Sequence, residues 1–317
     1  MKEVVAGIDI GGTNSAYGLV DQSGNILAEG SIETTKYPVI DDFVAAVASD
    51  IQKLLKAKKD LELKGIGIGA PNANYNKGTI ELAPNLAWKG IVPLASLFTK
   101  NTGVPVYTTN DANAAAIGEM VFGAAKNMKN FIVLTLGTGL GSGIVIDGKV
   151  VYGHTGFAGE LGHYIVEPGG RSCGCGRLGC SETYASATGL VRTALHLLSE
   201  TREDSPLRDI PPSQLTAKKV AELAAKNEPV ALKAMHYTAE KLGFVIINAV
   251  VFSSPEAIFL FGGLAQAGDL LFVPVRKYVE ENVQAIFRGT FRILPSGIPE
   301  TNAAVLGAAA LAWNELK

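Results

Sequence analysis

One short stretch of the chain holds every thiol of the protein together with a histidine. His163, Cys173, Cys175 and Cys180 follow the spacing H-x9-C-x-C-x4-C, and these three cysteines are the only ones in 317 residues. One imidazole nitrogen and three thiolate sulfurs form a closed tetrahedral set that suits Zn²⁺, and a zinc ion with four protein ligands is structural. The simpler alternative is a group of reduced surface thiols. The spacing favours a structural zinc site.

The residues around these ligands are rich in glycine and carry two carboxylates. The stretch 153–186 reads GHTGFAGELGHYIVEPGGRSCGCGRLGCSETYAS and shows no apolar period. Such a stretch buries little surface, so we expect a metal ion rather than a hydrophobic core to hold it. Glu160 and Glu182 lie close to the metal ligands, and carboxylates accept hydrogen bonds strongly from hydroxyl-rich ligands. Surface glutamates on a loop are the simpler interpretation of both residues.

Two turns of similar composition follow strands in different parts of the chain. VVAGIDIGGTNSAYGLVDQSG and FIVLTLGTGLGSGIVIDG each contain a strand, a glycine turn, a second strand and a further turn, which indicates an internal duplication. Glycine lets the backbone approach a phosphate closely, and threonine adds a hydroxyl donor. A single GGTN could be a hairpin turn and nothing more. The repetition favours phosphate binding by three turns, whose residues are Gly11, Gly12, Thr13, Asn14, Gly137, Thr138, Gly139, Gly262 and Gly263.

Two aspartates follow predicted strands and are candidates for the chemistry of phosphoryl transfer. Asp9 ends the first strand beside the GGTN turn, where a carboxylate suits Mg²⁺ or its bound waters. Asp111 follows the strand 104–108 and precedes a helix that begins at Asn113. Phosphoryl transfer depends on positioning and charge, plus one group that accepts the hydroxyl proton. Asp111 fits that role, but Asp111 or Asn113 could instead be the N-cap of the helix.

The elements that must position these residues alternate between strands and helices. An amphipathic helix is predicted from an N-cap at Asp41-Asp42 to about residue 58, and further helices over 93–103, 113–126, 182–198, 216–227, 229–252, 268–284 and 302–316. This alternation predicts an α/β fold with two similar domains that face each other across a cleft. Residues 72–88 form a predicted loop, on which Asn72 and Asn85 are weaker candidates for ligand contacts.

Composition excludes several classes of function. Hydrophobic residues make up 47% of the chain and charged residues 18%, and the net charge is −2 without a basic stripe, which argues against nucleic acid as a partner. No apolar run approaches the roughly 20 residues of a membrane span. The first residues, MKEVVAGIDIGG, do not resemble a signal peptide. We therefore expect a cytoplasmic protein that binds small molecules.

Several of these motifs resemble those of a known family. DIGGTN at 9–14, LGTGLGSG at 136–143 and FGG at 261–263 resemble the phosphate 1, phosphate 2 and adenosine motifs of the actin-like ATPase superfamily. Within that superfamily, three further motifs resemble the ROK family of sugar kinases and repressors over almost the whole chain: NDANAAAIGE at 110–119, GFAGELGH at 156–163 and CGCGRLGCSE at 173–182. Family members often carry Lys or Arg after GGT, where this chain has Asn14. We expect this difference to change how the phosphates are approached.

The resemblance implies a fold, an activity and a set of cofactors. The fold would be a duplicated actin-like ATPase (ribonuclease H-like) fold with two domains around a central cleft. A small domain of residues 1–112, on which a C-terminal helix 302–317 packs, would face a large domain of residues 113–301 with the zinc-binding loop. The protein would be a homodimeric hexose kinase of carbohydrate metabolism and glycolysis. It would use ATP and Mg²⁺, contain a structural Zn²⁺, and phosphorylate the 6-hydroxyl of a sugar, with glucose as the first candidate.

The resemblance also assigns roles to particular residues. Asp111 matches the catalytic base of the family and Asn110 its sugar-contacting amide. Glu160, His163 and Glu182 match residues that contact the sugar hydroxyls, so His163 would ligate zinc through one ring nitrogen and reach the sugar through the other.

Two other functions are open within the family, and one lies outside it. The acceptor could be mannose, fructose or N-acetylmannosamine instead of glucose. A sugar-responsive repressor would carry an N-terminal helix-turn-helix domain, for which we expect no room because Asp9 follows only eight residues. An actin-like filament or chaperone ATPase is disfavoured by the zinc stretch and the NDANAAA motif.

Overall fold

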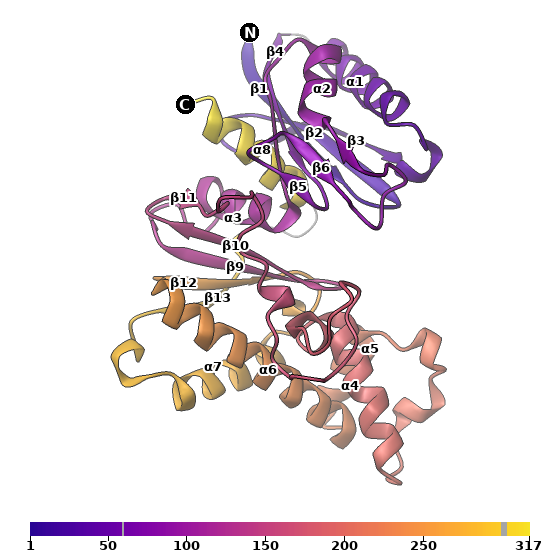
Figure 1. The fold of residues 1–317 in the computed structure, drawn as a ribbon, viewed down its shortest axis with the longest axis vertical. Helices are drawn as coiled ribbons and strands as arrows, with labels where there is room; N and C mark the ends of the chain where they lie inside the picture. The colour runs from indigo at the N-terminus through magenta and orange to yellow at the C-terminus, as the bar shows by residue number, and fades with distance from the viewer. Residues whose placement is uncertain (59, 299–302) are drawn as a thin grey trace. The chain divides into compact units, whose positions relative to one another are not determined.

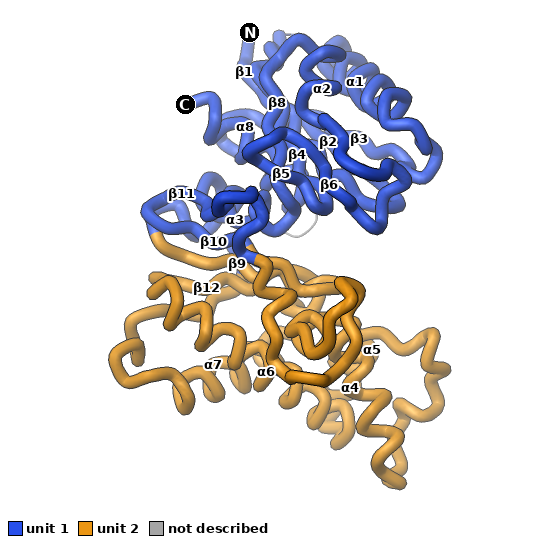
Figure 2. Tube along the Cα trace, viewed as in Figure 1, with its two compact units in different colours: residues 1–129, 143–159, 296–317 blue, residues 130–142, 160–295 orange. Residues whose placement is uncertain are grey.

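The computed structural model describes residues 1–58, 60–298 and 303–317 (Figure 1). The protein is a mixed α/β protein, as predicted, and it divides into two compact units (Figure 2). Unit 1 contains residues 1–129, 143–159 and 296–317, and unit 2 contains residues 130–142 and 160–295. The chain therefore passes from one unit to the other four times. The predicted domains 1–112 and 113–301 remain a proposal, since compact units and folding domains need not share limits.

Unit 1 is built on a five-stranded sheet with the order β3-β2-β1-β4-β8. The strands are β1 (Lys2–Ile10), β2 (Asn14–Val20), β3 (Ile26–Glu33), β4 (Leu61–Gly69) and β8 (Val106–Thr109). β1, β2 and β3 form an antiparallel meander, while β1, β4 and β8 run parallel. Residues 4–8 of β1 are all buried, as expected for a strand whose two faces are both covered.

Among its described residues, unit 1 has four α-helices, and one of them lies unusually close to the sheet. They are α1 (Ile40–Ala57), α2 (Leu94–Thr102), α3 (Asp111–Val121) and α8 (Ala303–Glu315). A Cβ atom on Gly7 or Gly67 would lie 2.1 Å from the Val305 oxygen or 1.8 Å from the Ala308 oxygen, so only glycine permits this approach of α8 to β1 and β4. Residue 302, where this helix was predicted to begin, lies outside the described residues.

Two predictions about unit 1 were wrong in detail. The N-cap of α1 is Val39, and Asp41 and Asp42 lie in the first turn, where carboxylates interact favourably with the helix dipole. The predicted loop 72–88 contains two strands of a small antiparallel sheet whose members are β5 (Ala73–Asn74), β6 (Thr79–Glu81) and β7 (Ile91–Val92). Strands of two or three residues are too short to show an alternating apolar pattern.

The second sheet has the order β11-β10-β9-β12-β13. Its strands are β9 (Phe131–Leu136), β10 (Leu140–Ile146), β11 (Lys149–Val150), β12 (Ala257–Phe261) and β13 (Arg292–Pro295), and β9, β12 and β13 are parallel. In both sheets, the strand before the glycine turn pairs in parallel with a strand from later in the chain, and the strands after the turn form an antiparallel hairpin. This correspondence agrees with the predicted duplication.

Unit 2 contains four α-helices among its described residues: α4 (Ala187–Glu200), α5 (Ala217–Ala224), α6 (Pro229–Ser253) and α7 (Asp269–Asn282). The helix predicted from residue 182 was placed too early. Residues 181–183 form a short 3-10 turn, and α4 begins after Ser186, whose Oγ accepts a hydrogen bond from the Gly189 N–H at 3.0 Å. Across the described parts of the chain, no helix combines the length and the apolar character that a membrane crossing requires.

Candidate active site and metal centre

Asp9 and Asp111 lie at the carboxyl ends of neighbouring parallel strands in unit 1. The register pairs Asp9 in β1 with Gly69 in β4, and Gly69 with Thr109 in β8. A Cβ atom on Gly69 would lie 4.0 Å from the Asp9 Oδ1 and 4.0 Å from the Asp111 Cα, so the two acids flank a position without a side chain. Ligands of open α/β sheets bind at this edge, beyond the carboxyl ends of the strands.

The environment raises the pKa of both carboxyl groups. Burial, followed by repulsion from Asp111, raises the pKa of Asp9 to about 6. The Asp111 side chain reaches solvent, but the protein around its other sides limits its hydration and raises its pKa above the usual range. The Ala112 N–H donates to the Asp111 Oδ1 at 2.9 Å and opposes that rise. Two acids with raised pKa values at one sheet edge are typical of a functional site.

Asp9→Asn should stabilise the protein when neither nucleotide nor divalent cation is present. The folded-state pKa of about 6 exceeds the ordinary value of 3.8, so ionisation of Asp9 destabilises the fold above pH 6 and has no effect below pH 4. We expect the variant to be more stable at pH 8 by on the order of 2 kcal/mol, since Asp9 is partly exposed. Thermal melts in EDTA at pH 4, 6 and 8 measure this, and an equal gap at all three pH values would contradict it.

Asn110, rather than Asp111 or Asn113, is the N-cap of α3. Its Oδ1 accepts a hydrogen bond from the Asn113 N–H at 2.7 Å. The cap uses the amide oxygen and fixes the side chain, which leaves the Nδ2 group as a donor. Asp111 is then the first residue of the helix, and its carboxylate lies where the helix dipole favours negative charge. The N-cap role, which was the alternative for Asp111, therefore belongs to Asn110.

The GGTN turn connects two antiparallel strands, as the hairpin interpretation required. The Gly11 N–H donates to the Asn14 oxygen at 3.1 Å, and a Cβ on Gly11 would lie 2.5 Å from that oxygen. A Cβ on Gly12 would lie 2.7 Å from the Asn85 oxygen, so the loop that carries Asn85 touches the turn. Thr13, Asn14 and Asn85 are exposed. The turn thus presents bare backbone and one hydroxyl to solvent, which a phosphate requires.

Asn72 is a poorer candidate for a ligand contact than its neighbours. It has a positive φ of 51°, and its Nδ2 donates to the Glu81 oxygen at 3.1 Å and the Leu82 oxygen at 3.4 Å. Its amide nitrogen therefore holds the loop, and only the amide oxygen remains for a ligand.

The second glycine turn and the FGG turn lie at one edge of the second sheet. β9 and β12 are parallel, with Thr135 paired to Phe261, and the Leu264 N–H donates to the Leu136 oxygen at 3.1 Å. Gly262 has a positive φ of 102°, and a Cβ there would lie 2.9 Å from the Leu136 oxygen. Gly137, Thr138 and Gly139 therefore lie beside Gly262 and Gly263.

The phosphate 2 turn also contacts the amino end of α4. The Ala187 N–H donates to the Gly137 oxygen at 2.9 Å, and the Thr188 hydroxyl donates to the Thr138 oxygen at 2.6 Å. The amino end of a helix favours anions, so its position beside this turn suits a phosphate.

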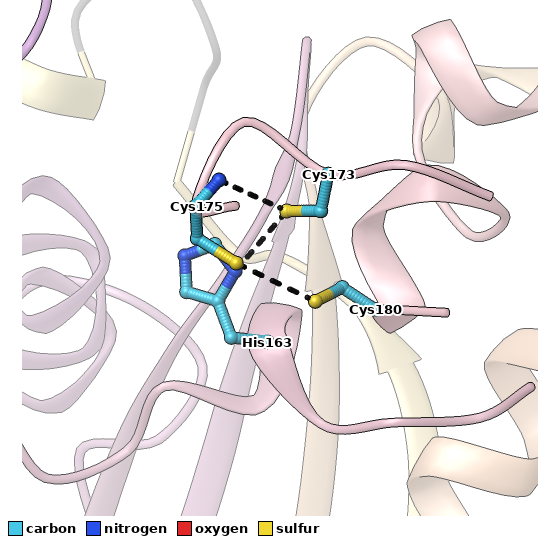
Figure 3. A group of neighbouring side chains, drawn as sticks. All are labelled: His163, Cys173, Cys175 and Cys180. Atoms are coloured by element: carbon cyan, nitrogen blue, oxygen red, sulfur yellow. Dashed lines mark hydrogen bonds between the residues drawn. The ribbon is translucent and has the colours of Figure 1, made fainter. Parts of the chain in front are cut away.

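His163, Cys173, Cys175 and Cys180 point toward one another, and their ligand atoms all lie within 4.8 Å of each other (Figure 3). The Cys175 and Cys180 sulfurs are 3.7 Å apart, and the Cys173 sulfur is 3.6 Å from the His163 Nδ1. A tetrahedral zinc ion with ordinary bond lengths places two sulfurs about 3.8 Å apart, and sulfur and nitrogen about 3.6 Å apart. The donor set and the spacing of its atoms therefore fit zinc.

Both predicted sugar-reading glutamates lie close to this cluster in the chain or in space. The Cys173 thiol donates to the Glu182 Oε1 at 2.9 Å, and the other Glu182 oxygen lies 2.5 Å from the position of a Cβ on Gly139. Glu182 therefore lies between the cluster of His163 and the three cysteines and the second glycine turn. Glu160 is exposed and precedes the short helix 161–163 that ends at His163.

Hydrogen bonds and aromatic contacts hold the stretch 153–186 more firmly than predicted. Its last residues, 179–186, are buried except for the half-buried Glu182, and they include Cys180 at 0% and Tyr184 at 3% exposure. Arg171 donates to the Thr183 oxygen at 2.8 Å and the Gly189 oxygen at 3.2 Å, and lies 4.5 Å from the centre of the Tyr184 ring. The expectation that this stretch buries little surface was wrong for its last residues, because a period-free sequence conceals contacts with distant helices.

Sequence reasoning also missed Asn74, which is fully buried. Its Nδ2 donates to the Thr155 oxygen at 2.8 Å and the Glu81 Oε1 at 3.2 Å. It thereby connects the small sheet to the residue just before the motif GFAGELGH. An asparagine beside two others in NANYN gives no local sign of this role, since loops commonly contain asparagine.

Comparisons with known proteins agree with these motifs. A sequence model of the ROK family matches residues 5–315. A glucokinase of Halalkalibacterium halodurans is 38% identical over 86% of this chain and 84% of the relative, and a xylose repressor of Caldicellulosiruptor bescii is 32% identical over 85% of this chain and 71% of the relative. A ROK family glucokinase of Streptomyces griseus, solved with glucose and AMPPNP, superimposes with a TM-score of 0.80 at 33% identity, over 98% of this chain and 99% of that one. The predicted actin-like ATPase fold is thereby confirmed.

The candidate residues fall into two groups. Unit 1 holds both acids, the GGTN turn, Asn110, Asn72 and Asn85. Unit 2 holds the second glycine turn, the FGG turn, Glu160, Glu182 and the four potential metal ligands. Each group combines a backbone suited to phosphate with side chains suited to hydroxyl groups.

Proposed function

The chain belongs to the ROK family, and on that premise we propose that it is a glucokinase, which transfers the γ-phosphoryl group of ATP to the 6-hydroxyl of glucose. Its similarity to glucokinases, including one solved with glucose and AMPPNP, makes it an ATP:hexose phosphotransferase. The choice of glucose among the hexoses is part of the proposal.

One observation carries the proposal most strongly, namely the pair of acids at the edge of the first sheet. Asp111 would accept the proton of the sugar hydroxyl, because it is accessible and its raised pKa makes it a better base than an ordinary aspartate. Asp9 would hold Mg²⁺ through bound water beside the polyphosphate. Asn110 would donate from its Nδ2 to a sugar oxygen, since its Oδ1 caps α3.

The glycine turns would bind the nucleotide. Backbone N–H groups of the two phosphate turns would approach the phosphates, and the FGG turn would pass close to the adenosine. Asn14 offers a short neutral amide where relatives often have a cation, so this chain would depend more on Mg²⁺ and backbone donors for charge stabilisation.

We further propose that His163, Cys173, Cys175 and Cys180 hold a structural Zn²⁺. The ion would fix the two arms that carry Glu160 and Glu182, whose carboxylates would accept hydrogen bonds from sugar hydroxyls. A zinc-bound thiolate has no proton to donate, so the Glu182 oxygen that accepts from Cys173 would become available to the sugar. The Nδ1 of His163 faces the thiols, which leaves its Nε2 for a sugar hydroxyl.

Sugar-dependent release of ADP is the direct test of the kinase. In a coupled assay we expect turnover only when a hexose is present, and the highest kcat/KM for glucose in a panel with mannose, fructose and N-acetylmannosamine. A higher kcat/KM for another sugar would replace glucose as the substrate. ADP release that is independent of sugar would overturn the kinase, and sugar binding without ADP release would favour a regulator like the xylose repressors. The homodimer and the cytoplasmic location remain predictions.

A further inference from the structure

Glu119, the last residue of the NDANAAAIGE motif, has a buried carboxylate with three hydrogen-bond donors. The side chain is 1% exposed. Its Oε1 accepts from the Ser296 hydroxyl and from the Gly297 N–H at 2.8 Å, and its Oε2 accepts from the Ala124 N–H at 2.9 Å. Hydrogen bonds to a carboxylate are about twice as strong as neutral ones. One side chain therefore joins the carboxyl end of α3 to a segment 177 residues later.

The segment that Glu119 binds, residues 296–298, lies directly against α3. A Cβ on Gly297 would lie 2.6 Å from the Ala124 nitrogen, and a Cβ on Gly118 would lie 2.8 Å from the Ile298 Cδ1. The Ser296 hydroxyl also accepts from the Ile298 N–H at 3.2 Å, which shapes the segment for this contact. The fit leaves no room for displacement of the segment without movement of the helix.

Residues 296–298 lie at the point where the chain passes from unit 2 back to unit 1. Pro295 ends β13 and unit 2, and Ser296 is the first residue of the last part of unit 1. Glu119 therefore fastens the chain at the point where it leaves unit 2. The same helix begins at Asp111, eight residues earlier and about 12 Å away along the helix axis. Movement of residues 296–298, the crossover segment, would therefore also move Asp111, the proposed base.

We propose that Glu119 is a positioning residue for phosphoryl transfer, which holds α3 to the crossover segment 296–298 and so fixes the place of the Asp111 carboxylate. This inference rests on the proposed role of Asp111. Glu119 itself does not touch the substrate. A displacement of about 1 Å in a reacting group can lower a rate about 100-fold, so a contact at the far end of the helix can control turnover.

Two substitutions test the contact from its two sides. Glu119→Gln keeps the size of the side chain but replaces one acceptor oxygen by an N–H₂ group that opposes a backbone donor. Ser296→Ala removes the hydroxyl and leaves the carboxylate. We expect kcat to fall at least about 10-fold in Glu119→Gln and about 3-fold in Ser296→Ala, with the sugar Kd within about 2-fold of the unsubstituted protein. Amide exchange at Gly297 should become faster in both variants.

Trp313→Phe is the matched control for a loss of stability alone. Trp313 is a buried residue of α8 in the same unit, and its Nε1 donates to the Asp21 oxygen at 3.1 Å. Its substitution should lower the melting temperature without a change in kcat at 25 °C. An unchanged kcat in Glu119→Gln and Ser296→Ala would overturn the proposal and leave Glu119 a stability residue. If Glu119→Gln does not fold, Ser296→Ala alone decides. The assignment of Asp111 as the base is tested separately, because its failure would appear as turnover by the Asp111→Asn variant.

Discussion

Asp111→Asn should abolish sugar-dependent turnover while sugar affinity remains nearly unchanged. The amide has almost the same shape as the carboxylate and can still accept a hydrogen bond from the Ala112 N–H. It cannot accept a proton from the sugar hydroxyl at neutral pH. A general base contributes about 10²- to 10⁴-fold to a rate, so we expect at most a few per cent of the original kcat. Initial rates of ADP release and calorimetric titration with glucose measure the two effects.

The stability of the Asp111→Asn variant gives an independent check on its environment. Because the pKa of Asp111 is raised in the folded state, ionisation destabilises the fold, and the neutral amide should melt at the same or a higher temperature at pH 8. Asp41→Asn is a suitable control, since it removes an exposed carboxylate from the first turn of another helix in the same unit. That control should retain full activity. An Asp111→Asn variant with substantial turnover would disprove the assignment of the base.

Cys175→Ser should weaken sugar binding much more than nucleotide binding. Cys175 is exposed, so its replacement by serine removes a metal ligand with little change in packing. Loss of zinc would release the two arms that carry Glu160 and Glu182, and we expect the sugar Kd to rise about 10-fold or more. The adenosine turn at residues 262–263 follows β12 and does not depend on the metal-binding stretch for its backbone path. The nucleotide Kd should therefore change by less than about 3-fold.

Three measurements separate the interpretations of this variant. Zinc content per chain should be close to one in the unsubstituted protein and strongly reduced in Cys175→Ser. Ser172→Ala, an exposed position in the same stretch, should retain both zinc and sugar affinity. A chelator should reproduce the effect of Cys175→Ser on the unsubstituted protein. Equal losses of sugar and nucleotide affinity would mean that the metal supports the whole unit, and the separation of roles would be wrong.

Residue type and spacing were sufficient to predict that His163 and the three cysteines form one cluster, and to predict the fold class. His163 and the three cysteines lie within 18 residues, and glycine between them lets the chain turn back on itself, so proximity in sequence became proximity in space. The alternation of strands and helices and the repeated glycine turns likewise indicated a duplicated α/β fold. Both inferences depend on short-range patterns, which a single sequence displays directly.

The sequence did not reveal two kinds of feature. One is contact between residues that are distant along the chain, and the other is a local hydrogen bond for which several neighbouring residues are equally suitable. The N-cap of α3 is Asn110, and three neighbouring polar residues in NDAN could each have filled that position. The burial of Tyr184 against helices of unit 2 was missed because its own stretch has no apolar period.

The sequence by itself determined which chemical groups the protein has, namely thiols and an imidazole for a metal ion, glycine turns for phosphates, and acids after strands. Only the tertiary structure decided which of those groups act together. The parallel pairing of β1, β4 and β8 brings Asp9 and Asp111 to the two sides of Gly69, where burial raises the pKa of both acids and the Asp111 charge adds to the rise at Asp9. The close approach of residues 296–298 to α3 likewise makes Glu119 a fastening point. Such pairs form because the strands and helices pack to bury apolar surface, and that packing brings together residues that no local pattern connects.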